Sequence, residues 1–326
     1  MEFRNPEEEL VVLCAQTPLM DPTKAQIQTL LEQPINWSAC HEYAQSQHVT
    51  PLFFHTLFTY WKRTPPAPFI DELRQWYQKH SIRNLMVTAE MLKFKQFGLE
   101  LDVPLLVVRG PVLARLTYGD VRLRQFANLD LFVHAEDVDR MRDLLLENNY
   151  DAITPAPPAE PRTDCAVFAH RSRLFNVELH WQLWPPHYDA RVTLDGAWDR
   201  LQSVAFTERE SMSTLAGGDL LLYLCGHGAV HDWSRLSYLC DVNQLLLSRV
   251  SFDWPGVAKQ ISRAQDGRSL LLGLALVRTV FGTTLPAEIA SMCDRDGQLN
   301  KRLTEALERM RERINQPGTA RSIHSN

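Results

Sequence analysis

The chain has 326 residues, of which 45% are hydrophobic and 22% are charged, and its formal net charge is −5. These values are ordinary for a globular protein of two or three structural units, and the lack of a basic surplus argues against indiscriminate binding of nucleic acid. No apolar run reaches the roughly 18 residues that a membrane-spanning helix needs, so we expect no membrane partner.

The six cysteines are scattered along the chain and form no CxxC pair. This distribution is typical of reduced, buried thiols, and it argues against a disulfide framework or a structural zinc site. The first residues are acidic and lack the apolar segment of a signal peptide. Together these features predict a cytoplasmic protein.

The first 100 residues predict a helical region. Asn5 is followed by a proline and three glutamates, and a capping side chain, a first-turn proline and acidic residues all suit the positive end of a helix. Similar starts precede three more short helices, at Asp21, Asn36 and Thr50. Apolar residues at helical spacing then predict a long amphipathic helix over residues 69–99.

Residues 101–212 have the pattern of a small α/β core. An apolar run over residues 104–108 predicts a buried strand, and Gly110 follows it at a strand-to-helix turn. A glycine in such a turn lets backbone N–H groups approach a phosphate. Further strands are predicted over 129–134, 165–170, 175–183 and 203–208, with a helix over 138–148 and a connector at 212–215.

From residue 213 onward the pattern is helical. Helices are predicted over 219–230, 235–249, 254–264, 267–281 and 288–314. His227 and His231 would share a helix face, at a spacing that can hold zinc, but the glutamate of the HExxH hydrolase motif is absent. The other interpretations are packing and hydrogen bonding where the helices meet the sheet, and contact with a substrate.

Polar side chains alternate along two of the predicted strands. Asn128 and Asp130 share one face of the first, and Glu178 and His180 share one face of the second, since side chains two residues apart point the same way. Close carboxylates repel one another unless a cation neutralises them. If the sheet presents Asn128, Asp130 and Glu178 together toward a cleft, these residues predict a site for Mg²⁺ (or Mn²⁺), of the kind used in phosphoryl and nucleotidyl transfer.

The order of these pieces resembles a known family. The pieces are Val107-Val108-Arg109-Gly110, Tyr118-Gly119-Asp120, Arg124, Asn128-Leu129-Asp130, Glu178-Leu179-His180-Trp181, His227-Gly228 and His231-Asp232-Trp233-Ser234-Arg235-Leu236. Over roughly residues 35–250 the chain is similar to a bacterial family of uncharacterised nucleotidyltransferases, within the DNA polymerase β superfamily.

The resemblance implies an α+β fold, in which a small mixed β-sheet of nucleotidyltransferase type (101–212) is flanked by an N-terminal helical region (1–100) and a C-terminal helical domain (213–326). It also implies transfer of a nucleoside monophosphate from an NTP to an acceptor. The implied metal ligands and catalytic residues are Asp130, Glu178 and Asn128. The implied nucleotide contacts are Arg109, Gly110, Arg124, His180, His231 and Arg235.

Two residues depart from the family's pattern. Asn128 stands where the family has its first catalytic aspartate, and Arg109 stands where it has a lysine. Arginine keeps the positive charge and suits phosphate as a fork, whereas asparagine keeps one acceptor oxygen and loses the negative charge. Asn128 therefore motivates a second hypothesis, a catalytically weakened fold that binds a nucleotide or a partner protein without turnover.

The sequence does not select an acceptor. A small molecule, a peptide, a protein side chain and an RNA end all remain open, with nucleic acid less favoured because the chain is acidic. Asp120, in the loop before the first strand, is a candidate for the carboxylate that Asn128 lacks. A role as a toxin or antitoxin component is a third hypothesis, which rests on analogy of fold alone.

Overall fold

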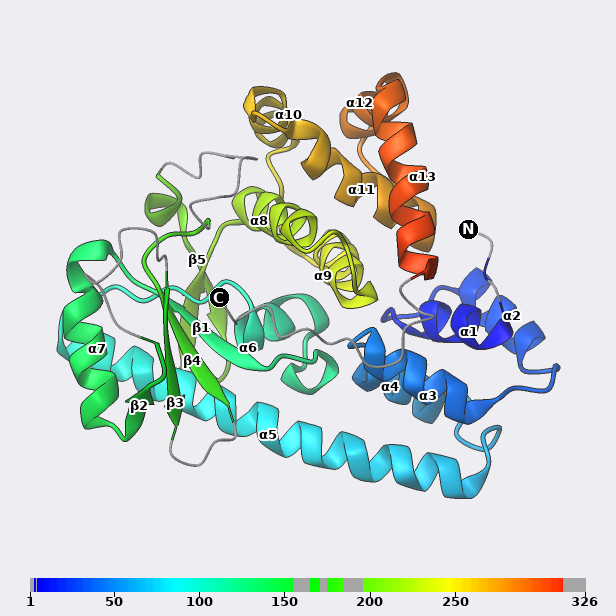
Figure 1. Ribbon diagram of the computed structural model, residues 1–326, viewed down its shortest axis with the longest axis horizontal. Helices are drawn as coiled ribbons and strands as arrows, with labels where there is room; N and C mark the ends of the chain where they lie inside the picture. The colour runs from blue at the N-terminus through cyan, green and yellow to red at the C-terminus, as the bar shows by residue number, and fades with distance from the viewer. Residues whose placement is uncertain (1–2, 4, 155–164, 171–174, 185–195, 313–326) are drawn as a thin grey trace.

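The computed structural model describes residues 3, 5–154, 165–170, 175–184 and 196–312. Within them a small mixed sheet and a two-stranded sheet lie among helices, so the fold is α+β, as the sequence predicts. Helix α5 (Ala67–Glu100) runs along the molecule from the N-terminal helices to the sheet (Figure 1). No helix in the described ranges is long and apolar enough to cross a membrane.

Four short helices form the N-terminal end of the molecule. They are α1 (Pro6–Cys14), α2 (Asp21–Leu30), α3 (Trp37–Ser46) and α4 (Thr50–Tyr60). The side chain of Asn5 accepts a hydrogen bond from the backbone N–H of Glu8, and Asn36 accepts one from Ala39. These caps satisfy N–H groups that the helix leaves without a partner, so both helices begin where the sequence predicts.

The larger sheet has four strands in the order β1-β4-β3-β2. They are β1 (Asn128–Phe132), β2 (Tyr150–Ala152), β3 (Cys165–His170) and β4 (Asn176–His180). β1 and β4 are parallel, whereas β3 is antiparallel to both of its neighbours, so the sheet is mixed as predicted. The parallel pairing aligns Asp130 with Glu178, and strand alternation puts both on the same face.

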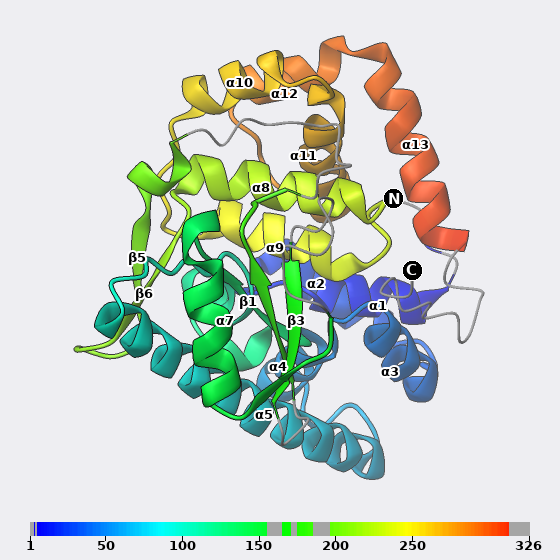
Figure 2. The same ribbon diagram turned by 60° about the vertical axis from the view of Figure 1, so that its left-hand side comes forward.

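The two faces of this sheet have different surroundings. The apolar face shares one buried core with α5 and with α7 (Val138–Glu147). Its main members are Leu129, Leu131, Val177 and Leu179 from the strands, Val87, Met91 and Phe94 from α5, and Met141 and Leu145 from α7. The polar face is turned toward α8 (Gly217–Val230), and Figures 1 and 2 place α7 beside the strands and α8 above them.

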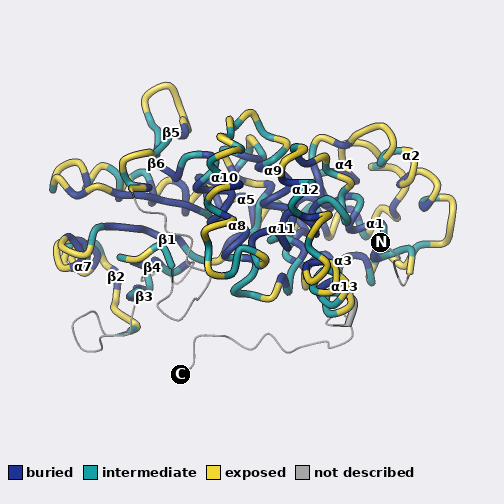
Figure 3. Tube along the Cα trace, turned by 90° about the horizontal axis from the view of Figure 1, so that it is seen from above, coloured by how far each residue is buried: buried dark blue, intermediate teal, exposed yellow. Residues whose placement is uncertain are grey.

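The C-terminal helices pack with the N-terminal ones. After α8 come α9 (Leu236–Leu247), α10 (Trp254–Arg263), α11 (Gly267–Phe281), α12 (Ala287–Arg295) and α13 (Gly297–Glu312). One buried cluster includes apolar residues of α1 to α4 and of α8 to α13. In Figure 3 the buried trace gathers around α8, α9 and α11, in the middle of the molecule. The division of the chain into three regions stays a prediction.

Two expectations about the strands need correction. Residues 104–108 form no regular strand, because Leu106 makes an isolated antiparallel bridge to Phe132 while the N–H of Val107 donates to Ser213 in the other sheet. The segment therefore ties the two sheets together. The predicted connector at 212–215 is wrong, since β6 (Ser211–Thr214) pairs antiparallel with β5 (Gln202–Ala205).

The helix predicted over 288–314 is two helices in the described residues, which extend to 312. α12 ends at Arg295 and α13 begins at Gly297. Between them the carboxylate of Asp296 accepts hydrogen bonds from the backbone N–H groups of Gln298 and Leu299. Aspartate and glycine are weak helix formers in a helix interior and favourable at a start, so the Asp296-Gly297 pair begins a new helix.

Candidate functional site

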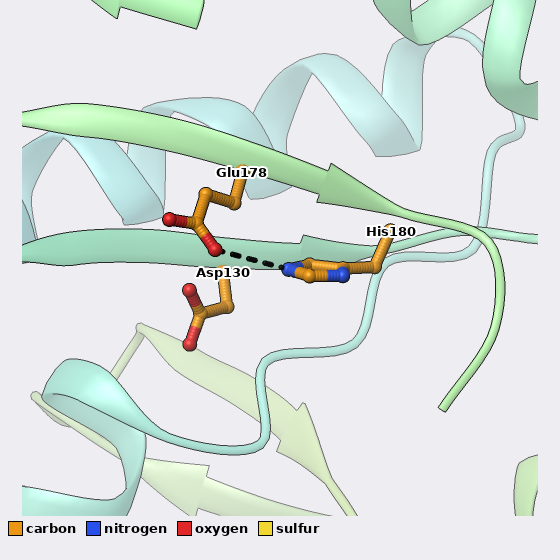
Figure 4. Close-up of side chains that lie close together, drawn as sticks. All are labelled: Asp130, Glu178 and His180. Carbon is orange, nitrogen blue, oxygen red and sulfur yellow. Dashed lines mark ion pairs between the residues drawn. The ribbon is translucent and has the colours of Figure 1, made fainter. Parts of the chain in front are cut away.

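Two carboxylates and an imidazole lie together on the polar face of the sheet. The Asp130 and Glu178 side chains, opposite one another on β1 and β4, are each only 9% exposed. His180 lies two residues beyond Glu178, with its Nε2 atom 3.5 Å from Glu178 Oε2. The possible ligand atoms of these three residues all lie within 4.8 Å of one another (Figure 4). We call Asp130, Glu178 and His180 the acidic cluster.

A buried arginine neutralises part of this charge. The guanidinium NH2 atom of Arg109 lies 2.7 Å from Asp130 Oδ2, and NH1 lies 2.5 Å from Nε2 of His227. Burial opposes the charge of Arg109, but Asp130, Tyr223 and Glu178 outweigh this and raise its pKa above the ordinary value. The guanidinium of Arg109 thus lies between the sheet and α8, and it is the cation next to the two carboxylates.

The turn that aims Arg109 depends on Gly110. Arg109 directly precedes α6 (Gly110–Leu113), and Gly110 has a φ of +58°, in the left-handed region. A side chain there would meet nothing nearer than the carbonyl oxygen of Asn128, at 4.0 Å, so the backbone conformation rather than space requires glycine. The sequence predicts this turn, whereas the contact between Arg109 and Asp130 needs the folded chain.

Asn128 lies on the same face as the acidic cluster and contacts it. Its Nδ2 atom donates a short hydrogen bond to Glu178 Oε1. The amide therefore stabilises the carboxylate as a neutral donor, in the position where an aspartate would add a third negative charge. Its Oδ1 atom stays an oxygen ligand of the kind that a divalent cation accepts.

His180 supplies an observation that bears on metal binding. Its ring stacks on Phe132, with 4.8 Å between the ring centroids. Its Nε2 atom is buried and has no hydrogen-bond partner among the described residues, although it lies near Glu178. A buried polar atom without a partner is unfavourable, and a cation between the carboxylates would provide one. Two carboxylates and an imidazole form a donor set that fits a divalent ion such as Mn²⁺, and the carboxylates suit Mg²⁺.

His227 of α8 lies beside Arg109, and His231 directly follows the same helix. Burial and then the nearby Arg109 hold the pKa of His227 well below its ordinary range, so the neutral ring can accept a hydrogen bond from the guanidinium. The His227 ring also contacts His231 at 4.6 Å and Tyr238 at 5.4 Å, and His231 stacks on Tyr238. No group of three or more metal-ligating residues includes either histidine in the described ranges, so the zinc interpretation lacks a third ligand.

Arg124 lies elsewhere. Its Nε and NH2 atoms donate to the two carboxylate oxygens of Asp241 in α9, at 2.8 and 2.7 Å, and the hydroxyl of Tyr118 donates to the same carboxylate at 3.0 Å. Both partners of this ion pair are largely buried. Arg124 thus joins the segment before β1 to the C-terminal helices rather than contacting the acidic cluster.

The remaining predicted residues lie outside the cluster. Arg235 precedes α9 and is near His48, whose pKa is lowered to about 4 by burial and then by Arg235 and Arg124. Asp120 pairs with Arg122 at 2.6 Å and is not part of the cluster. His227, for which the sequence left packing, hydrogen bonding, substrate contact and zinc binding open, contacts Arg109. The signal for it was present, since it begins the His227-Gly228 piece of the resemblance.

Comparison with known proteins identifies one family. Residues 33–282 match the model of a protein family described as uncharacterised nucleotidyltransferase. The matched range includes the acidic cluster and all of the other predicted site residues. No curated protein matches the chain.

Proposed function

Because the chain belongs to the family of uncharacterised nucleotidyltransferases, we propose that it transfers a nucleoside monophosphate from an NTP to an acceptor, with Mg²⁺ or Mn²⁺ as cofactor. The observation that carries this proposal is the pairing of Asp130 with Glu178 on adjacent parallel strands. Beside them lies the Nε2 atom of His180, 3.5 Å from Glu178 Oε2 and without a hydrogen-bond partner among the described residues. Arg109 balances only one of these two nearly buried carboxylates, and a metal ion there would balance the remaining negative charge.

Each residue of the site has a distinct part in this function. Asp130 and Glu178 would hold the metal, which would supply Lewis-acid chemistry at the α-phosphate. Arg109 presents a forked cation to the phosphates, and Gly110 lets backbone approach them. Pro111 has no N–H, so Gly110 and Val112 provide the nearest backbone donors.

Other polar groups orient these ligands. Asn128 holds one oxygen of Glu178 through its amide, and His180 lies next to the other. These contacts fix the rotamer of a carboxylate that must point at the metal. The proposed contacts to the nucleotide or the acceptor, farther from the carboxylates, are His231 and Arg235. His231 directly follows α8, and Arg235 directly precedes α9. Arg124 holds α9 in place through its ion pair with Asp241.

A second candidate function is a nucleotide-binding or protein-interaction module without turnover. Asn128 favours it, since its amide occupies one oxygen of Glu178 and brings no negative charge of its own. Loss of one carboxylate from a metal site lowers the affinity for a second cation, and transfer chemistry in this fold depends on placing cations at the phosphates.

The test is calorimetric titration with α,β-methylene analogues of the four NTPs, with and without Mg²⁺ or Mn²⁺. We expect metal-dependent binding in the wild type that is abolished by Asp130→Ala and by Glu178→Ala. Asp120→Ala is the matched control, because it removes a carboxylate outside the cluster. Release of pyrophosphate from the natural NTPs then separates the enzyme from the binding module. Unchanged binding in both cluster variants would refute the site.

A further inference from the structure

We propose that Arg109 makes metal binding and nucleotide binding depend on one another, because its guanidinium competes with the metal for Asp130 until the phosphates of a nucleotide draw it away. This inference rests on the proposed function and names how the same site is regulated. In the free protein the Arg109 guanidinium occupies the Asp130 carboxylate, and the metal and the nucleotide bind together.

The guanidinium of Arg109 lies in direct contact with a proposed metal ligand. Arg109 NH2 and Asp130 Oδ2 are 2.7 Å apart, and the two side chains are 21% and 9% exposed. A divalent cation shared by Asp130 and Glu178 would lie within a few ångströms of this guanidinium. Two cations at such a distance in a poorly solvated place repel one another strongly. Arg109 therefore lowers the affinity of the site for the metal when no nucleotide is bound.

The other contacts of the Arg109 side chain are with neutral groups. NH1 meets neutral His227, Tyr223 also hydrogen-bonds to the side chain, and Nε is buried without a hydrogen-bond partner among the described residues. Asp130 is therefore the charged group in direct contact with Arg109. Phosphate oxygens offer a guanidinium two parallel charge-assisted hydrogen bonds, which these neutral partners do not match.

Arg109 therefore links the affinity for the metal to the affinity for the nucleotide. A nucleotide that takes Arg109 removes the cation that opposes the metal, and a metal that takes Asp130 releases Arg109 for the phosphates. Each ligand must strengthen the other by the same factor, because coupling between two binding equilibria is reciprocal. The fork of Arg109 suits this exchange, since it reaches Asp130 and His227 at once, whereas a lysine in its place would offer one point of contact.

The experiment measures Mn²⁺ binding by electron paramagnetic resonance of the free ion, alone and with the α,β-methylene analogue of ATP. In the wild type we expect the analogue to tighten Mn²⁺ binding about tenfold, within the usual range of coupling between sites. In Arg109→Met we expect Mn²⁺ alone to bind about tenfold more tightly, and the analogue to add little. Arg109→Lys should lie between the two.

Arg122→Met is the matched control, because it removes a guanidinium whose carboxylate partner, Asp120, lies outside the acidic cluster. It should leave both affinities for Mn²⁺ unchanged. Circular dichroism and thermal unfolding check that each variant folds, and Arg109→Lys carries the test if Arg109→Met does not. Equal binding of Mn²⁺ alone by the wild type and the folded Arg109 variants, with binding that still needs Asp130, would overturn the inference and leave the proposed function intact. No Mn²⁺ binding by any protein would overturn both.

Discussion

At the scale of single residues, the site is a balance of charge. Asp130 and Glu178 bring two negative charges to a nearly buried face, and Arg109 brings one positive charge. Asn128 completes the arrangement with a neutral amide that donates to Glu178. An asparagine at this position, rather than an aspartate, therefore spares the metal-free cluster a further negative charge, which would repel Glu178.

This balance predicts the effect of Asn128→Asp. Without metal, the added carboxylate loses the hydrogen bond to Glu178 and repels it, so we expect destabilisation by roughly 1 to 3 kcal/mol. With Mn²⁺ the same carboxylate becomes a ligand, and the melting temperature should rise more than in the wild type. Thermal unfolding with and without Mn²⁺ measures both effects.

Asn300→Asp, at an exposed position of α13, is the control and should show no dependence on Mn²⁺. A stability of Asn128→Asp that is the same with and without the ion would contradict the charge argument. Gain of pyrophosphate release in Asn128→Asp would favour the weakened fold, and a large loss of an existing activity would mean that asparagine is the working residue.

At the scale of elements, a tryptophan fixes how two helices meet beside the site. Trp233 is 1% exposed and lies after α8, with Asp232 and Trp233 both in the left-handed region at φ values of 52° and 50°. Its ring lies against Gly228 of α8 and Gly273 of α11, where an added Cβ atom would come within 2.4 and 2.5 Å of it. In the His227-Gly228 pair, the histidine thus contacts Arg109 and the glycine leaves the space that this ring occupies.

We therefore predict that Gly228→Ala destabilises the protein by roughly 1 to 3 kcal/mol, as overpacking in a closed core does. The methyl group has no space unless the indole moves, and the indole is buried on all sides. Urea unfolding of the two proteins measures the difference. Gly297→Ala is the matched control, since a Cβ atom at that exposed position meets nothing within 4 Å and should be neutral or slightly stabilising. Equal effects of the two changes would argue against the packing described.

At the scale of the whole molecule, histidines kept neutral by burial are spread over the fold. Burial lowers the pKa of His80 in α5 and of His48 before α4 to about 4, with help from neighbouring arginines, and burial and then Arg109 hold the pKa of His227 well below its ordinary value. The ordinary pKa is 6.5. A histidine with a lowered pKa takes up its proton more readily in the unfolded chain, so its contribution to stability is complete above about pH 6.5 and is lost as the pH falls toward 4.

Stability should accordingly fall on mild acidification. Between pH 7.5 and pH 5 we expect His80 alone to account for a loss of about 2 kcal/mol in the free energy of unfolding, from the difference between its folded and unfolded pKa. Urea unfolding at several pH values gives the slope, and His80→Gln should flatten it even if it lowers stability at neutral pH. A slope that is the same in His80→Gln and in the wild type would show that this histidine titrates normally in the folded protein.

The sequence by itself determined the features that act over a few residues. Capping by Asn5 and Asn36 set where two helices begin, and alternation along the strands put Asn128 and Asp130 on one face. The ordered pieces also indicated the family. These signals are local, because a cap satisfies N–H groups within one turn and strand alternation has a period of two residues.

The tertiary structure decided which distant groups meet. Arg109 finds His227 across 118 residues, and Arg124 finds Asp241 across 117, and no pattern within either segment selects these partners. Nor did the apolar run at 104–108 reveal that it would bridge two sheets. Such contacts follow from how the faces of helices and strands pack, since burial depends on apolar area and not on chain order. The charge balance of the acidic cluster is therefore a property of the folded chain.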